Sequence, residues 1–208
     1  MRLLLAIVAA LALAPAASAW TTLATGVQNI VVPSILVTQT GTELVSWESP
    51  VAGTISLSRD HASAATLVSG DPIAGRTQLV QQPTGAIQLY FPNGQGVARM
   101  TSTDDGQTWT GPVQTQSHTV GGVMAVAVAP DGTPYFAQDG TGFVNVFRGL
   151  NGETVRNVFP RCCGYAESLA VDTTGLVQIA FYSNADPDGT FLYERLAADL
   201  SVAGSTAL

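Results

Sequence analysis

The chain has 208 residues and a formal net charge of −7 at pH 7, with 8 basic residues against 15 acidic ones. No lysine occurs and the arginines are scattered, so the composition disfavours nucleic acid and anionic membranes as partners. The length suits one folded domain, and 2 cysteines are too few for a disulfide framework.

The N-terminal segment has the pattern of an export signal. Arg2 precedes an apolar run, and Ala17 to Ala19 supplies the small residues that a signal peptidase requires before Trp20. We therefore expect residues 1–19 to be removed and the remaining chain to be secreted. The apolar run is shorter than the roughly 20 residues of a membrane span, and no later stretch replaces it, so no membrane span is expected.

A unit with a nearly constant period recurs four times in the rest of the chain. Each copy contains an apolar run, a turn with a glycine and a second apolar run. The turn glycines are Gly41, Gly85, Gly132 and Gly175, which gives spacings of 44, 47 and 43 residues. A period near 45 is typical of β-propeller blades, so the sequence predicts an all-β propeller with about four blades.

A third apolar run follows each pair after a short polar loop. These runs begin at Gly53, Gly96, Gly142 and Gly189. They are rich in strand-forming residues and bounded by turn residues, which favours four-stranded antiparallel blades. We expect one domain over residues 20–208, with blades near residues 30–70, 75–117, 121–160 and 165–208. An irregular β-sandwich is the alternative fold.

A motif of eight residues follows the third strand of the second copy. It matches the Asp-box pattern Ser-x-Asp-x-Gly-x-Thr-Trp at every defined position, with Ser102, Asp104, Gly106, Thr108 and Trp109. In a hairpin, Asp104 can accept bonds from backbone N–H groups, Gly106 can adopt a positive φ and Trp109 can pack between neighbouring strands. We interpret the motif as a structural clip.

With this motif and the repeat, the chain resembles the sialidase-like β-propellers, the bacterial neuraminidase repeat family, over residues 21–208. A decayed motif at Ser58 to Asp60 fits such an array. The resemblance implies a six-bladed propeller, so four blades would form an incomplete one. It also implies an arginine triad that grips a sugar carboxylate, but Val31 stands where the first arginine belongs. Catalysis is therefore left open, and no catalytic residue is predicted.

A ligand of a propeller binds at its mouth, which is formed by the segments leading into the inner strands and the loops after the second strands. The most unusual such segment is Arg161 to Glu167, because the adjacent cysteines can close a strained vicinal disulfide. Two buried thiols, or pairing with a segment outside the chain, are the alternatives. The candidate ligand-binding residues are Arg161, Cys162, Cys163, Tyr165, Glu167, Arg76, Trp47, Glu48 and Tyr182.

Three functions remain open at this point. The first is a secreted propeller that binds a glycan or a cell-surface polymer without catalysis. The second is a fragment of an exo-sialidase-type glycoside hydrolase, and the third is an extracellular scaffold for protein interactions. No cofactor is expected. No metal is expected either, because His118 is a lone histidine and the acidic turn at Asp186 to Gly189 lacks the spacing of a calcium loop.

Overall fold

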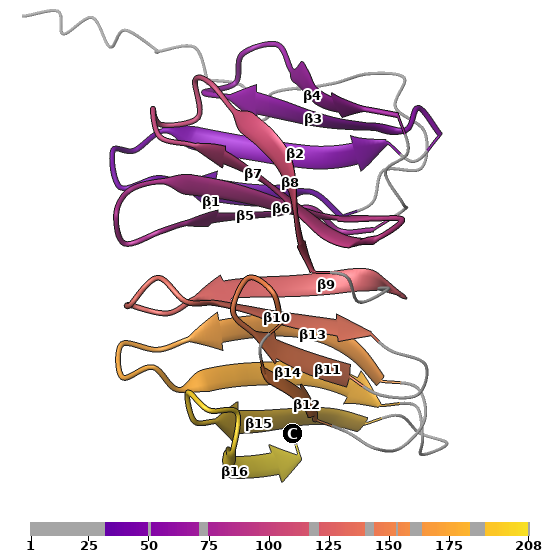
Figure 1. Ribbon diagram of the computed structural model, residues 1–208, viewed down its shortest axis with the longest axis vertical. Coiled ribbons are helices and arrows are strands. Elements are labelled where there is room, and N and C mark those ends of the chain that lie inside the picture. Colours follow the sequence, from indigo (N-terminus) through magenta and orange to yellow (C-terminus); the bar gives the residue numbers. More distant parts are fainter. Residues whose placement is uncertain are drawn as a thin grey trace, which may run out of the picture.

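The computed structural model describes residues 32–49, 51–70, 75–116, 121–139, 144–152, 154–158, 164–183 and 190–207. These residues form four antiparallel sheets of four strands each, which we number as blades 1 to 4 in chain order (Figure 1). The prediction of an all-β fold with four blades is confirmed. The irregular sandwich is wrong, because the strands divide into four separate sheets rather than two packed ones.

Within each blade, neighbouring strands are consecutive in the chain. Blade 1 contains β1 (Ser34–Val37), β2 (Glu43–Ser49), β3 (Thr54–Arg59) and β4 (Ala65–Ser69). Blade 2 contains β5 (Gln78–Gln81), β6 (Ile87–Asn93), β7 (Gly96–Ser102) and β8 (Thr110–Gln116). Blade 3 contains β9 (Gly121–Val128), β10 (Pro134–Asp139), β11 (Val144–Arg148) and β12 (Thr154–Asn157). Blade 4 contains β13 (Gly164–Val171), β14 (Val177–Ser183), β15 (Thr190–Leu196) and β16 (Val202–Ala207).

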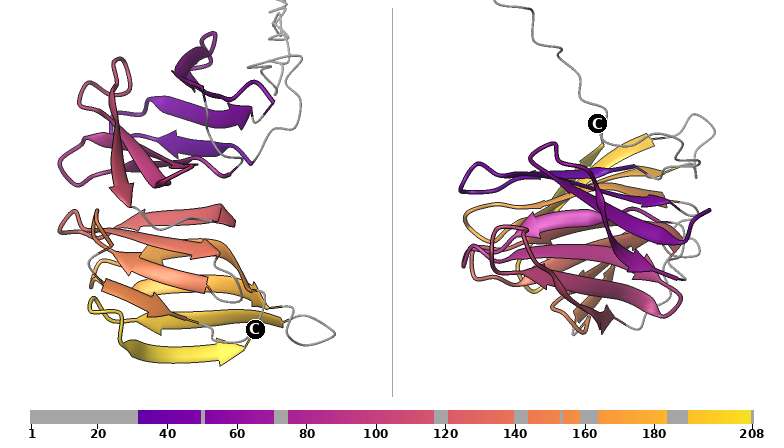
Figure 2. Two further views of the ribbon diagram at one scale, coloured as in Figure 1. Left: turned by 45° about the vertical axis from the view of Figure 1, so that its right-hand side comes forward. Right: turned by 90° about the horizontal axis from the view of Figure 1, so that it is seen from above.

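The first strand of each blade is its inner strand. β1 contacts β5, β5 contacts β9 and β9 contacts β13, so the inner strands form a continuous row through the molecule. Blades 1 and 4 lie at opposite ends of the array (Figures 1 and 2). Blades 2 and 3 therefore present one face of their sheet to the preceding blade and the other face to the following blade.

A glycine turn joins the first two strands of every blade. The four glycines have φ values of 90°, 87°, 87° and 86° at Gly41, Gly85, Gly132 and Gly175. In each turn the glycine N–H donates to the carbonyl oxygen three residues earlier, with N···O distances of 2.8 to 3.0 Å. Because a side chain is strained at such φ values, glycine is the residue that lets these turns close.

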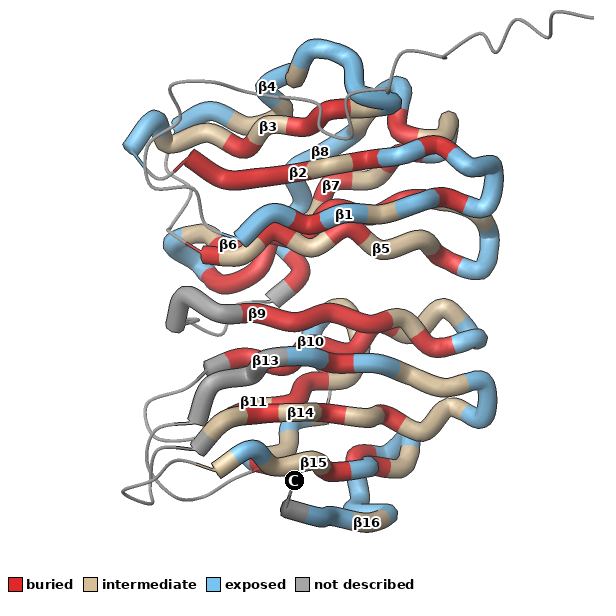
Figure 3. The backbone as a smooth tube through the Cα atoms, turned by 180° about the vertical axis from the view of Figure 1, so that it is seen from behind, coloured by how far each residue is buried: buried red, intermediate tan, exposed pale blue. Residues whose placement is uncertain are grey.

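The hydrophobic core consists of layers between successive blades, and buried residues follow the strands through the middle of the array (Figure 3). Between blades 1 and 2, Leu44 and Ile55 belong to the same buried cluster as Leu89. Between blades 2 and 3, the ring of Tyr90 meets that of Phe136 edge to face, with the ring centroids 5.1 Å apart. The adjacent β6 residues Leu89 and Tyr90 therefore pack on different blades, Leu89 on blade 1 and Tyr90 on blade 3.

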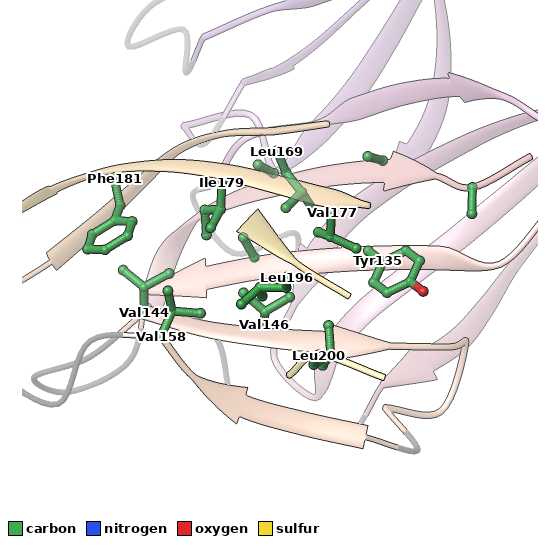
Figure 4. Packing of buried hydrophobic residues seen from close by; sticks show 14 residues of the cluster. Tyr135, Val144, Val146, Val158, Leu169, Val177, Ile179, Phe181, Leu196 and Leu200 are labelled. Atoms are coloured by element: carbon green, nitrogen blue, oxygen red, sulfur yellow. The ribbon is translucent and has the colours of Figure 1, made fainter. Parts of the chain in front are cut away.

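The layer between blades 3 and 4 joins β11 to β14 and β15. Val144 and Val146 of β11 pack in one cluster with Ile179 and Leu196, and all four side chains are fully buried (Figure 4). Full burial of such a side chain contributes roughly 1.5 to 3 kcal/mol. The three layers together therefore hold the blades in a row.

Shortening a single buried side chain in one of these layers should lower the stability of the whole array. Leu89→Ala is expected to reduce the free energy of unfolding by about 2 to 5 kcal/mol, because Leu89 is fully buried between blades 1 and 2. Val113→Ala on β8 is the control, since Val113 is 55% exposed and should change stability by no more than about 0.5 kcal/mol. Urea unfolding measures both, and equal losses would contradict the layer as described.

Candidate functional site

The mouth of the array is the end at which the second strands finish and the inner strands begin. At blade 1 this end carries Glu48, one residue before the end of β2. The described part of the segment leading into β5 begins with Gly75, whose backbone N–H donates to Oε2 of Glu48 at 3.0 Å. This hydrogen bond joins blade 1 to blade 2 at the mouth.

Glu48 is a buried acid. Its exposed fraction is 1%, and its Oε1 atom has no hydrogen-bond partner among the described residues. Burial raises the pKa of Glu48 from 4.5 to about 7, and the N–H of Gly75 opposes this rise only in part. The carboxyl group can therefore release or take up a proton near neutral pH, as a general acid or base must.

Trp47, Arg76 and Tyr182 lie at the same end of the array. Trp47 precedes Glu48 on β2 and so points to the opposite face of the sheet, where it is 6% exposed. Arg76 follows the glycine that binds Glu48 and is half-buried. Tyr182 lies near the end of β14 on blade 4 and is also half-buried. The structure thus brings Glu48 and Arg76 to one corner of the mouth, with Tyr182 on another blade.

The remaining candidates lie wholly or partly outside the described residues. Arg161, Cys162 and Cys163 lie outside them, so the vicinal disulfide stays a prediction. For Tyr165 and Glu167 the structure describes the backbone of β13 but not the side chains. Tyr165 is the register partner of Tyr182 on β14, which places its backbone beside that candidate.

The residues from Ser102 to Trp109 form a closed turn after β7. Asp104 accepts hydrogen bonds from the Thr108 hydroxyl at 2.5 Å, the Thr108 backbone N–H at 2.9 Å and the Ser102 hydroxyl at 2.8 Å. These bonds lower the pKa of Asp104 to about 2. Gly106 has a φ of 82° and donates its N–H to the Ser102 hydroxyl, while Nε1 of Trp109 donates to the Gly106 carbonyl at 3.2 Å. Each defined position of the motif therefore contributes to closing this turn.

Asp105, which the motif leaves undefined, joins this turn to blade 1. Its Oδ2 atom accepts hydrogen bonds from the hydroxyl groups of Thr42 and Thr40, and these bonds lower the pKa of Asp105. Arg59 donates its Nε–H to the Asp105 carbonyl oxygen at 3.1 Å. The partners are 46 to 65 residues away along the chain, so no local signal in the sequence could have identified these contacts.

Two other classes of site can be assessed for the described part of the chain. There, no three His, Cys, Asp or Glu side chains gather into a set that could hold a metal ion. No helix in these ranges is long and apolar enough to cross a membrane. His118 and the acidic turn at Asp186 to Gly189 lie outside the described residues.

Solved structures share this arrangement of blades. An α-L-arabinofuranosidase from Fusarium graminearum, in complex with an iminosugar inhibitor, matches 89% of this chain with a TM-score of 0.60 and 11% identity. An α-L-arabinanase from Penicillium chrysogenum, in complex with arabinobiose, matches 86% with a TM-score of 0.56 and 13% identity. The chain has a β-propeller fold.

A polysaccharide lyase described as an ulvan lyase also has this fold, with a TM-score of 0.55, 12% identity and 84% of this chain matched. The chain spans 56% of that lyase, 66% of the arabinanase and 68% of the arabinofuranosidase. No family model and no curated protein sequence matches the chain. At these identities the likeness concerns the fold alone.

Two glycines with similar backbone conformations should respond differently to alanine. Gly106 and Gly85 have φ values of 82° and 87°, so both variants should lose about 1 to 2 kcal/mol through backbone strain. A Cβ atom on Gly106 would also lie 2.8 Å from Cδ2 of the fully buried Leu44, whereas a Cβ on Gly85 would have no neighbour within 4 Å. Gly106→Ala is therefore expected to lose a further 1 kcal/mol or so in urea unfolding. A loss no larger than that of Gly85→Ala would refute the close contact.

The raised pKa of Glu48 predicts a specific dependence of stability on pH. As the pH rises from about 4.5 to about 7, the unfolded chain loses the Glu48 proton while the folded chain retains it. Stability should therefore fall across this window, by an amount on the order of 3 kcal/mol. Glu48→Gln keeps an acceptor for the Gly75 N–H but cannot ionise, so this part of the slope should disappear. Melting temperatures of both proteins between pH 4 and 8 test this, and parallel curves would contradict the shift.

Proposed function

We propose that this chain is a secreted, sialidase-like β-propeller that binds a carbohydrate at its mouth. The observation that carries the proposal is the fold likeness to proteins that act on or hold sugars, namely the arabinofuranosidase, the arabinanase with its bound arabinobiose and the ulvan lyase. The sialidase-like assignment within that fold rests on the Ser102 to Trp109 motif of this sequence.

The described part of the mouth has groups that suit a sugar. Arg76 can donate hydrogen bonds and the Tyr182 ring offers an apolar face, and both side chains are half-buried. Binding sites for small molecules combine a few such polar groups with apolar surface. Tyr165 and Glu167, whose backbone lies in β13, would extend this set on blade 4.

Glycoside hydrolysis is the second candidate function, and the raised pKa of Glu48 favours it. Hydrolysis of a glycosidic bond by the common mechanism needs one carboxyl that carries a proton at working pH and a second one that is ionised. Glu48, with a pKa of about 7, fits the first role. Asp139 at the end of β10 and Glu167 in β13 are candidates for the second role by their place in the strands alone, because the structure describes their backbone and not their side chains.

Binding should depend on the mouth and not on the opposite end of the blades. We expect the purified chain to bind arabinan, ulvan or a sialoside on a glycan array, and Arg76→Ala to weaken that binding about tenfold or more. Gln39→Ala is the matched control, because Gln39 is an exposed residue in the glycine turn between β1 and β2, away from the mouth. Binding that is absent, or lost equally in both variants, would contradict a glycan site at the mouth.

Catalysis is tested separately with fluorogenic arabinofuranoside and sialoside substrates. Turnover that is lost in Glu48→Gln, with glycan binding retained, would assign the proton donor of a hydrolase. The pH profile of kcat should then show a limb near the Glu48 pKa of about 7. Binding without turnover would instead support the non-catalytic carbohydrate-binding propeller.

A further inference from the structure

The array has two sheet faces without a neighbouring blade among the described residues. One belongs to blade 1 and the other to blade 4, and Figure 3 looks onto both, because blades 2 and 3 lie behind them. We call the first the leading face, defined by Ile35, Val37 and Val45. We call the second the trailing face, defined by Tyr182, Phe191, Tyr193 and Arg195.

On the leading face, Ile35 occupies a position that is buried in every other blade. It pairs in register with Val45 of β2. The residues with the same place in the other inner strands pair in the same way, and they are Leu79, Val126 and Leu169. Those three side chains are 5%, 5% and 9% exposed, because each packs on the preceding blade, whereas Ile35 is 69% exposed and Val37 is 62% exposed.

The trailing face likewise has an exposed apolar side chain at a position that is buried in the other three blades. Phe191 of β15 pairs in register with Tyr182 of β14, and the two rings lie 5.2 Å apart. The residues equivalent to Phe191 in the other third strands are Ile55, Val97 and Val144. All three are 0% exposed, each in the layer that joins its blade to the next, whereas Phe191 is 52% exposed. Exposed apolar groups that cluster in this way mark an interaction surface.

The charges at the rims of the two faces are complementary. Between blades 1 and 2, Arg59 at the end of β3 reaches Asp105 in the turn after β7. Arg195 on blade 4 is equivalent to Arg59 on blade 1. Each arginine pairs in register with the third residue after the turn glycine of its own blade. On blade 1, Glu43 of β2 pairs in register with Val37, which puts it on the leading face. Its side chain is 48% exposed, and its Oε2 atom lies 3.0 Å from Nε2 of His61. An arginine on the trailing face thus matches a carboxylate on the leading face.

We propose that two copies of this chain associate with the leading face of each packed on the trailing face of the other. Such a contact repeats the chemistry of the junctions between blades, with aliphatic and aromatic side chains inside and an arginine with a carboxylate at the rim. Both faces look to the same open side of the array (Figure 3), so a two-fold axis can make the contact twice and close the assembly at two copies. Tyr182 belongs to both the trailing face and the proposed mouth site, whereas Ile35 and Phe191 belong to the two faces alone.

Sedimentation velocity of the purified chain across a wide range of concentration tests this proposal. We expect a dimer, and we expect Ile35→Ser and Phe191→Ser each to raise the dissociation constant about tenfold or more. Val113→Ser is the matched control, because Val113 is 55% exposed on β8 and lies on neither face. It should leave the dimer unchanged. If the unaltered chain precipitates, the double variant Ile35→Ser with Phe191→Ser should stay in solution as a monomer while Val113→Ser precipitates.

A mixture of the two single variants shows which faces meet. In a mixed dimer, the intact leading face of the Phe191→Ser copy can pack on the intact trailing face of the Ile35→Ser copy. The other contact of that mixed dimer joins the two altered faces. If Ile35 and Phe191 meet across the contact, the second loss there is smaller than the first, so the mixed dimer should be tighter than the geometric mean of the two variants. A monomeric unaltered chain, variants that associate as the unaltered chain does, or a mixture no tighter than the geometric mean of its components would overturn the proposal.

Discussion

Blades 2 and 3 are sheets that must each bury both of their faces, and the rest of the structure depends on this requirement. Leu89 and Tyr90 are neighbours on β6, yet one packs towards blade 1 and the other towards blade 3. Such strands are apolar on both sides instead of alternating with polar residues. A single blade could not satisfy this requirement alone, so the blades stabilise one another through the layers between them.

The sequence predicted those parts of the structure that depend on local chemistry. A turn with φ near 90° needs glycine, so Gly41, Gly85, Gly132 and Gly175 revealed both the hairpins and the period of the array. The turn closed by Asp104 could likewise be predicted from the sequence, because its hydrogen-bond donors Ser102 and Thr108 lie within four residues of Asp104. Strand-forming runs between such turns leave few alternatives to an antiparallel blade.

Features that depend on the packing of one blade against another could not be predicted. Nothing near Glu48 in the sequence indicates that this acid is buried, and its burial follows from the approach of Gly75 from blade 2. Asp105 binds Thr40 and Thr42 across a junction that no local pattern marks. For the described candidates at the mouth, the exposure and the hydrogen-bond partners of each side chain follow from tertiary contacts and not from any local pattern.

The glycine turns and the mouth lie at opposite ends of the same hairpins, and this separates the control of strand register from the control of recognition. One ring of equivalent positions near the mouth holds four chemically different residues, namely Glu48, Pro92, Asp139 and Tyr182. The four hairpins keep the same register with these four different residues at the ring, because the glycine turns at the far end set the register. If the mouth binds a ligand as proposed, related chains can carry different residues at this ring while every hairpin keeps its register.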